Sequence, residues 1–184
     1  LLGEIQFMPR EAAENDPNWK QIIPYQIVVR GGMPLVYART KKAGEQRLAS
    51  RRSIGIGGHI NRDDVRQVEA KSGLSIYLAG ARRELAEEIS ISNPGPTTSA
   101  IAGVVNDDSN SVGEVHLGFV HVIHLDELGG VGYGTEGQDH HIQLIGFQSP
   151  MKALLMGSTP VDDWTRMCLQ AYADLLDNPN SVSI

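Results

Sequence analysis

Residues 81–91 read Ala81-Arg82-Arg83-Glu84-Leu85-Ala86-Glu87-Glu88-Ile89-Ser90-Ile91. They predict a helix, because Ala, Leu, Arg and Glu are strong helix formers and neither Pro nor Gly interrupts the run. At about 100° per residue, Glu84, Glu87 and Glu88 share one face of that helix. A second face is apolar and can enter a hydrophobic core. Its members are Leu78, Ala81, Leu85 and Ile89.

Three carboxylates within one helical turn repel one another, and this repulsion destabilises the helix. A bound cation would remove the repulsion. Mg²⁺ or Mn²⁺ suits these oxygen donors best, because no Cys or His accompanies them. The alternative is a solvated acidic face on which Arg83 pairs with Glu87 one turn later. The helix alone leaves both interpretations open.

Composition limits the possible partners. The chain has 184 residues, 41% apolar and 21% charged, and we expect one domain over 1–184 with a loop-rich lead-in at about 1–20. A net charge of −6 and the lack of a dense Lys/Arg tract argue against binding to duplex DNA or to an anionic membrane. No apolar run approaches membrane-spanning length, and no signal-peptide pattern opens the sequence. The single cysteine, Cys168, is compatible with a reducing compartment, so we expect a cytoplasmic protein.

Strands interleaved with helices predict a mixed β-sheet between helices, an α/β class. Residues 114–125 are apolar on both faces, so we expect that strand to be covered on both sides. Residues 61–74 should form a loop or short helix, with Ser75 as N-cap of the carboxylate helix. The run 129–134 should be a flexible loop. The expected strands are 4–8, 25–30, 35–39, a short one from Ser53, 98–105, 114–125 and 142–147.

A final helix is expected at about 160–177, capped by Ser158-Thr159-Pro160 with the proline near the first helical position. Apolar residues recur along it at helical spacing, which predicts one buried side. The residues expected on that side are Val161, Trp164, Cys168, Ala171, Tyr172 and Leu175.

The glycine pair Gly57-Gly58 and the carboxylate helix together resemble the Nudix hydrolases. That family's motif is Gly, five residues, Glu, seven residues, then Arg-Glu-hydrophobic-X-Glu-Glu-X-Gly-hydrophobic. Residues 83–91 match the second half, with Ser90 in place of Gly, and Gly58 fits the opening Gly. Asp64 stands where the family has Glu, and 18 residues instead of seven separate it from Arg83, an insertion of 11.

The resemblance implies an α/β/α sandwich that hydrolyses the diphosphate linkage of a nucleoside diphosphate joined to another group, using Mg²⁺ or Mn²⁺. It implies that the metal ligands are Glu84, Glu87, Glu88 and the Gly58 carbonyl. Arg83 would orient a helix carboxylate and would not contact the substrate. The chemistry agrees, since diphosphate hydrolysis needs a cation on the phosphate oxygens and an activated water.

In this family a Glu from a distant loop often completes the metal site or acts as base. Glu136, in the Gly-rich segment just before a strand, is the candidate here, and Glu114 is the alternative. The basic residues within 41–52 are expected to be solvated, although a polyphosphate could use such charges.

The histidines carry weaker expectations. His59, next to Gly58, could contact a phosphate, but a hydrogen-bonded loop histidine is the simpler interpretation. Two adjacent histidines without further spaced ligands do not make a zinc site. The others are expected to make local hydrogen bonds or to face solvent: His116, His121, His124, His140 and His141.

The insertion and the two departures from the motif keep a second function class open. Asp64 is one methylene shorter than Glu, and Ser90 tolerates a left-handed backbone less well than Gly. The alternative to an enzyme is therefore a Nudix-like module that binds a nucleotide or a protein partner without turnover. A small diphosphate substrate is the expected partner, and a homodimer through the apolar N-terminal hairpin is an open alternative.

Overall fold

A computed structural model describes residues 5–40, 51–70, 72–93, 98–135, 142–155 and 159–177 of the chain. The central element is a mixed β-sheet, seven-stranded within these residues, in which β1 and β7 run parallel and the other pairs run antiparallel. The path is β3 (Arg52–Ser53), β2 (Met33–Arg39), β1 (Gln21–Arg30), β7 (His116–Leu125) and β6 (Thr98–Val105). In addition, β1 pairs with β4 (Gly55–Ile56), and β2 pairs with β9 (Ile142–Phe147).

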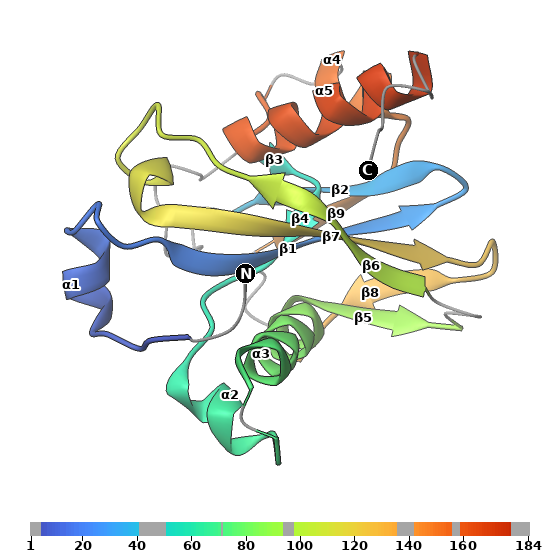
Figure 1. The fold of residues 1–184 in the computed structure, drawn as a ribbon. Helices are drawn as coiled ribbons and strands as arrows, with labels where there is room; N and C mark the ends of the chain where they lie inside the picture. Colours follow the sequence, from blue (N-terminus) through green and yellow to red (C-terminus); the bar gives the residue numbers. More distant parts are fainter. Residues whose placement is uncertain are drawn as a thin grey trace.

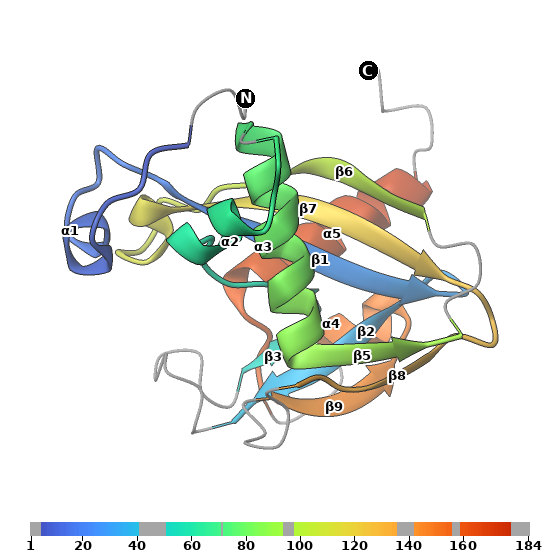
Figure 2. The same cartoon turned by 90° about the horizontal axis from the view of Figure 1, so that it is seen from below.

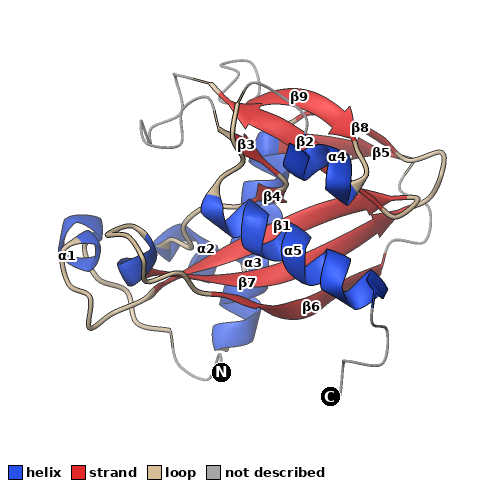
Figure 3. Ribbon diagram, turned by 90° about the horizontal axis from the view of Figure 1, so that it is seen from above, coloured by secondary structure: helices blue, strands red, loops and turns tan. Residues whose placement is uncertain are grey.

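Helices cover both faces of this sheet (Figure 1). One face carries α3 (Gly73–Glu88), with α2 (Arg62–Arg66) beside it, and the other carries α5 (Asp163–Asp177) and α4 (Pro150–Leu155), as Figures 2 and 3 show from opposite sides. A two-stranded sheet of β5 (Ile89–Ser92) and β8 (Gly130–Tyr133) continues from the end of α3. This arrangement is the α/β/α sandwich that the sequence predicts.

Strand β1 shows why the sheet lies between two apolar layers. Tyr25, Ile27 and Val29 belong to the core cluster that includes Leu169 of α5, whereas Val28 belongs to the cluster on the other side. Successive side chains of a strand point to opposite faces, so β1 is buried on both. Residues of β7 also enter both clusters, which confirms the expectation of a strand covered on two sides.

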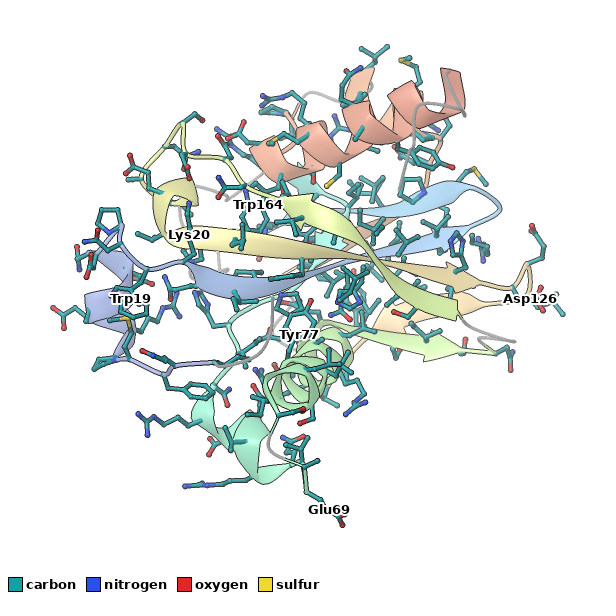
Figure 4. The ribbon with its side chains drawn as sticks, in the orientation of Figure 1. Trp19, Lys20, Glu69, Tyr77, Asp126 and Trp164 are labelled. Carbon is teal, nitrogen blue, oxygen red and sulfur yellow. The ribbon has the colours of Figure 1, made fainter. Side chains whose placement is uncertain are left out.

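Two aromatic residues reach the sheet from opposite helices (Figure 4). Trp164 of α5 makes an edge contact with Tyr25, with ring centroids 5.6 Å apart. Tyr77 of α3 stacks on His121 of β7, and its hydroxyl lies 2.6 Å from His121 Nε2. Both helices are therefore fixed to the sheet by specific contacts as well as by apolar burial.

The ends of the carboxylate helix differ from the prediction. Its N-cap is Ser72, whose side chain accepts from the Ser75 N–H, so Ser75 is the third residue of a capping box and not the cap. The helix ends at Glu88, and Ile89–Ser92 is a strand because it pairs with β8, which occupies most of the expected flexible loop at 129–134.

Other boundaries also shift. The final helix begins at Asp163, later than expected, because the Asp162 carboxylate accepts from the Thr165 N–H at 2.7 Å. Thr165 and Leu169 are buried on its inner side, whereas Ala171 is exposed and Leu175 lies where the side chains are not described. Two short helices were not predicted, α1 (Arg10–Glu14) and α4, and the described part of 4–8 forms no strand. No helix in the described ranges is long and apolar enough to cross a membrane.

Candidate active site

The first element of the site is a buried ion pair between α2 and α3. Asn61 caps α2, and the fully buried Asp64 accepts from the Asn61 N–H at 2.8 Å. Both oxygens of Asp64 also accept from Arg83, from Nε at 2.8 Å and from Nη2 at 3.1 Å. Gly80 of α3 lies against this carboxylate, and a Cβ there would come within 2.9 Å of it. A buried carboxylate is tolerated here because a bidentate guanidinium and a backbone N–H saturate it.

Arg83 uses every hydrogen-bond donor that it has. Besides the two bonds to Asp64, its Nη1 donates to Glu84 Oε1 at 2.9 Å and to Glu87 Oε2 at 2.8 Å. Its Nη2 also donates to the His59 carbonyl at 2.9 Å. A guanidinium has five N–H groups, so Arg83 has none left for a substrate. The Asp64 bond is the main reason that the pKa of Arg83 is raised above its ordinary value.

The glycine loop lies directly against the carboxylate helix. A Cβ at Gly58 would collide with the Glu84 carboxylate, and a Cβ at Gly57 would collide with the Pro24 carbonyl of β1. From the sequence, glycines are expected here to allow close approach of the backbone. Gly58 allows the contact with Glu84, and Gly57 allows the contact with Pro24. The loop and the first carboxylate of the triplet therefore meet in space.

The three helix carboxylates are half-buried and do not point freely into solvent. The side chains of Glu84 and Glu87 are 15% and 26% exposed, and Glu88 is also partly buried. Burial raises the pKa of Glu84, the Arg83 hydrogen bond opposes this shift, and the charges of Glu87 and Glu88 add to it. A cation bound here would relieve both the burial cost and the mutual repulsion.

The donor set fits a hard divalent cation in its chemistry. Arg83 contacts one oxygen of Glu84 and one of Glu87, so the second oxygen of each remains for a metal. Among the described residues, no three His, Cys, Asp or Glu side chains are already gathered closely enough to hold a metal.

The other candidate residues have mixed outcomes. Glu136, His140, His141 and most of 41–52 lie outside the described residues. Glu114 is exposed in a 3₁₀ turn (Gly113–Val115) that precedes β7, so it does not begin the strand as expected. The residue before Glu136, Thr135, donates its N–H to the Ala86 carbonyl of α3 at 3.1 Å.

Three of the histidines for which the sequence suggests hydrogen bonds make them. His116 Nδ1 donates its proton to the Val112 carbonyl at 2.7 Å, and His116 Nε2 lies 3.3 Å from the side-chain nitrogen of Gln21. His59 Nε2 lies 3.1 Å from His116 Nε2, so the two rings share a hydrogen bond. Burial is the main reason that the pKa of His59 falls to about 4. His59 is thus neutral near pH 7. His121 bonds Tyr77 as described.

Sequence reasoning missed two parts of the site. It gave Asp64 no role, although the spacing Asn61-X-X-Asp64 is a capping-box signal that fixes the carboxylate near Arg83. It also left Ser90 as a concern at the helix exit. Ser90 lies in the extended strand β5, and Asn93 is the only non-glycine with positive φ in the described residues, so Ser90 needs no left-handed conformation.

Fold and geometry together define an α/β/α protein with an acidic site of oxygen donors on one helix beside a glycine loop. Solved structures identify the architecture. Tm1382, assigned to the Nudix hydrolases, superposes with a TM-score of 0.63 at 22% identity over 92% of this chain and 79% of that one. A Nudix hydrolase from Alicyclobacillus acidocaldarius gives a TM-score of 0.51 at 13% identity over 84% of this chain and 91% of that one. The chain therefore has the Nudix fold, which confirms the resemblance at the level of fold.

Sequence comparison adds one relative. Protein YmaB of Bacillus subtilis (strain 168) is 37% identical over 118 residues, which are 64% of this chain and 55% of YmaB. The match thus spans about half the length of that relative. No protein-family model matches the chain.

Proposed function

We propose that the protein is a divalent-metal-dependent hydrolase of a diphosphate linkage in a nucleoside diphosphate-type small molecule. The observation that supports this function best is the contact between Gly58 and the Glu84 carboxylate, with Glu87 and Glu88 on the same helix face. This contact gathers oxygen donors beside a backbone that can approach a phosphate. Mg²⁺ or Mn²⁺ at these oxygens would polarise the diphosphate and lower the pKa of a bound water.

The residues of the chain divide the work. Glu84, Glu87, Glu88 and the Gly58 carbonyl would hold the metal. Arg83 acts through Glu84 and Glu87 by fixing their orientation, since its donors are all used. Glu136 is proposed as the remote carboxylate, a role supported by the N–H bond that ties its neighbour Thr135 to α3.

The test is turnover of a panel of nucleoside diphosphate derivatives with Mg²⁺ or Mn²⁺ by the parent, Glu87→Gln and Glu88→Gln. Each variant should lose at least about 100-fold in kcat, more than the loss of an outer-shell partner costs a metal site. Glu69→Gln, in an exposed position before α3, is the matched control and should keep full activity. Unchanged turnover in both helix variants would show that the assignment is wrong.

Calorimetry with Mn²⁺ separates the enzyme from a binding module that has the same fold. Metal binding that requires all three helix glutamates supports the enzyme. Binding of a nucleotide that is indifferent to metal and to the glutamates would support the module instead.

A further inference from the structure

Arg39 is the last residue of β2, and its half-buried side chain has few hydrogen-bond partners among the described residues. Its backbone N–H donates to the Arg51 carbonyl at 3.0 Å. The side chain is half-buried, and Nη2 makes one long hydrogen bond of 3.4 Å to the Tyr37 hydroxyl. Nε is shielded from solvent and has no hydrogen-bond partner among the described residues. The ion pairs found in those residues do not include Arg39.

Such an environment is costly for a guanidinium. A buried donor without an acceptor loses its hydration and gains nothing in return. The stacking contact with Tyr37 is a weak compensation, because the guanidinium carbon lies 5.8 Å from the ring centre, near the limit of a cation–π interaction. Unsatisfied buried donors are rare in folded proteins, and each one therefore points to a missing partner.

The position of Arg39 connects it to the candidate site. The Tyr37 hydroxyl donates to the Gly55 carbonyl at 2.5 Å, and Gly55 begins the strand that leads into Gly57 and Gly58. Hydrogen bonds thus link Arg39 through Tyr37 to the strand that leads into the glycine loop, and Gly58 of that loop lies against the Glu84 carboxylate.

Electrostatics place Arg39 in the field of the carboxylate helix. The pKa of Arg39 is raised, first by Tyr37 and then by Asp162 and Glu88, while burial acts in the opposite direction. Glu88, on the acidic face of α3, is thus one of the groups whose charge acts on Arg39.

We propose that Arg39 binds a phosphate oxygen of the substrate's diphosphate, an oxygen that the metal ion does not take. A planar guanidinium matches a phosphate in shape and charge, and Nε of Arg39 has no partner among the described residues. Arg83 cannot fill this role, because its five donors are used within the protein. This inference rests on the proposed function, and it names a residue outside the helix motif.

The experiment measures binding of methylenediphosphonate, a non-hydrolysable diphosphate, in the presence of Mg²⁺ by calorimetry. Arg39→Gln should weaken binding about 10- to 100-fold, the range expected when a charge-assisted hydrogen bond is lost. Arg39→Lys keeps the charge but loses the planar guanidinium donors, so its affinity should lie between those of the parent and Arg39→Gln. Arg66→Gln removes an equally charged but exposed side chain and should bind as the parent does.

Melting temperatures without metal or ligand test a structural role for Arg39. Removing a buried cation with unsatisfied donors should leave the melting temperature of Arg39→Gln unchanged or higher. A melting temperature several degrees below that of the parent would identify a structural cation and overturn the proposal. Equal binding by the parent and Arg39→Gln, or no binding by the parent, would also overturn it.

Failure of this inference can be told apart from failure of the proposed function. If the parent binds methylenediphosphonate through Arg39 but hydrolyses nothing in the substrate panel, the phosphate site stands and the enzyme assignment fails. If the parent turns over a substrate and Arg39→Gln does so with the same KM, the enzyme stands and the role of Arg39 is wrong.

Discussion

Asp64→Asn should destabilise the protein strongly, because it removes the charge from the carboxylate that Arg83 contacts with two donors. The Asp64 side chain is fully buried and that of Arg83 is only 18% exposed. Asn has the same size but only one acceptor oxygen, so its NH₂ group must face Arg83 Nε in one orientation, or Arg83 Nη2 and the Asn61 N–H in the other. Breaking a buried pair in this way costs about 3–5 kcal/mol, and the partial exposure of Arg83 favours the lower end.

At about 2–4 °C per kcal/mol for a chain of this size, a loss of about 3 kcal/mol lowers the melting temperature by about 6–12 °C. The adjacent residue provides the control. Asp63 pairs with Arg66 in an exposed position, with side chains 71% and 83% accessible, and such pairs contribute about 1 kcal/mol or less. Thermal unfolding followed by circular dichroism should therefore separate Asp64→Asn clearly from Asp63→Asn. Closely similar melting temperatures of the two variants would refute this reasoning.

Two further predictions concern buried groups outside the site. Burial, with a contribution from Asp162, raises the pKa of the Cys168 thiol to about 12, so the native protein should react with iodoacetamide at pH 8 about a thousandfold more slowly than a free thiol. Labelling at the free-thiol rate without denaturant would contradict that burial. Burial lowers the pKa of His121, so the unfolded chain binds its proton more readily, and stability should fall as pH drops below about 6.5. Urea unfolding at pH 7 and pH 5.5 should show a smaller loss of stability for His121→Gln than for the parent, whereas the exposed His124→Gln should lose as much as the parent does.

Much of the fold follows from short-range patterns. The β1–β2 hairpin was predictable because Gly31 and Gly32 separate two apolar runs, and both have positive φ, 55° and 74°. The helix carrying Glu84 was predictable from its composition, since that segment has no competing structure. These elements depend on neighbours in sequence, so the sequence alone contains the information.

Elements that depend on a distant partner were missed. Ile89–Ser92 continues a helical composition, but Ile has β propensity as well, and pairing with Gly130–Tyr133 decides in favour of a strand. The glycines of that partner suggested a loop, because no local pattern shows that they face Ser90 and Ser92 across a ladder. Long-range pairing overrode local preference in both segments.

The same reasoning explains why the longer gap in the motif leaves the ion pair intact. The 18 residues that separate Asp64 from Arg83 include the end of α2 and the first turns of α3, and they follow an Asp64 that is already fixed by the Asn61 cap. Asp64 therefore meets Arg83 although its side chain is shorter than that of Glu, and Gly80 leaves the space for it.

Saturation of Arg83 has a consequence for the chemistry of the site. A diphosphate brings more negative charge than one dication neutralises, and the helix face adds carboxylates to it. Arg83 gives all its donors to Asp64, Glu84, Glu87 and His59. A second cation that offsets the charge of a bound diphosphate would therefore come from elsewhere in the fold. Arg39 has an unsatisfied donor and lies within the field of Glu88, so the charge balance of the site favours it as that cation.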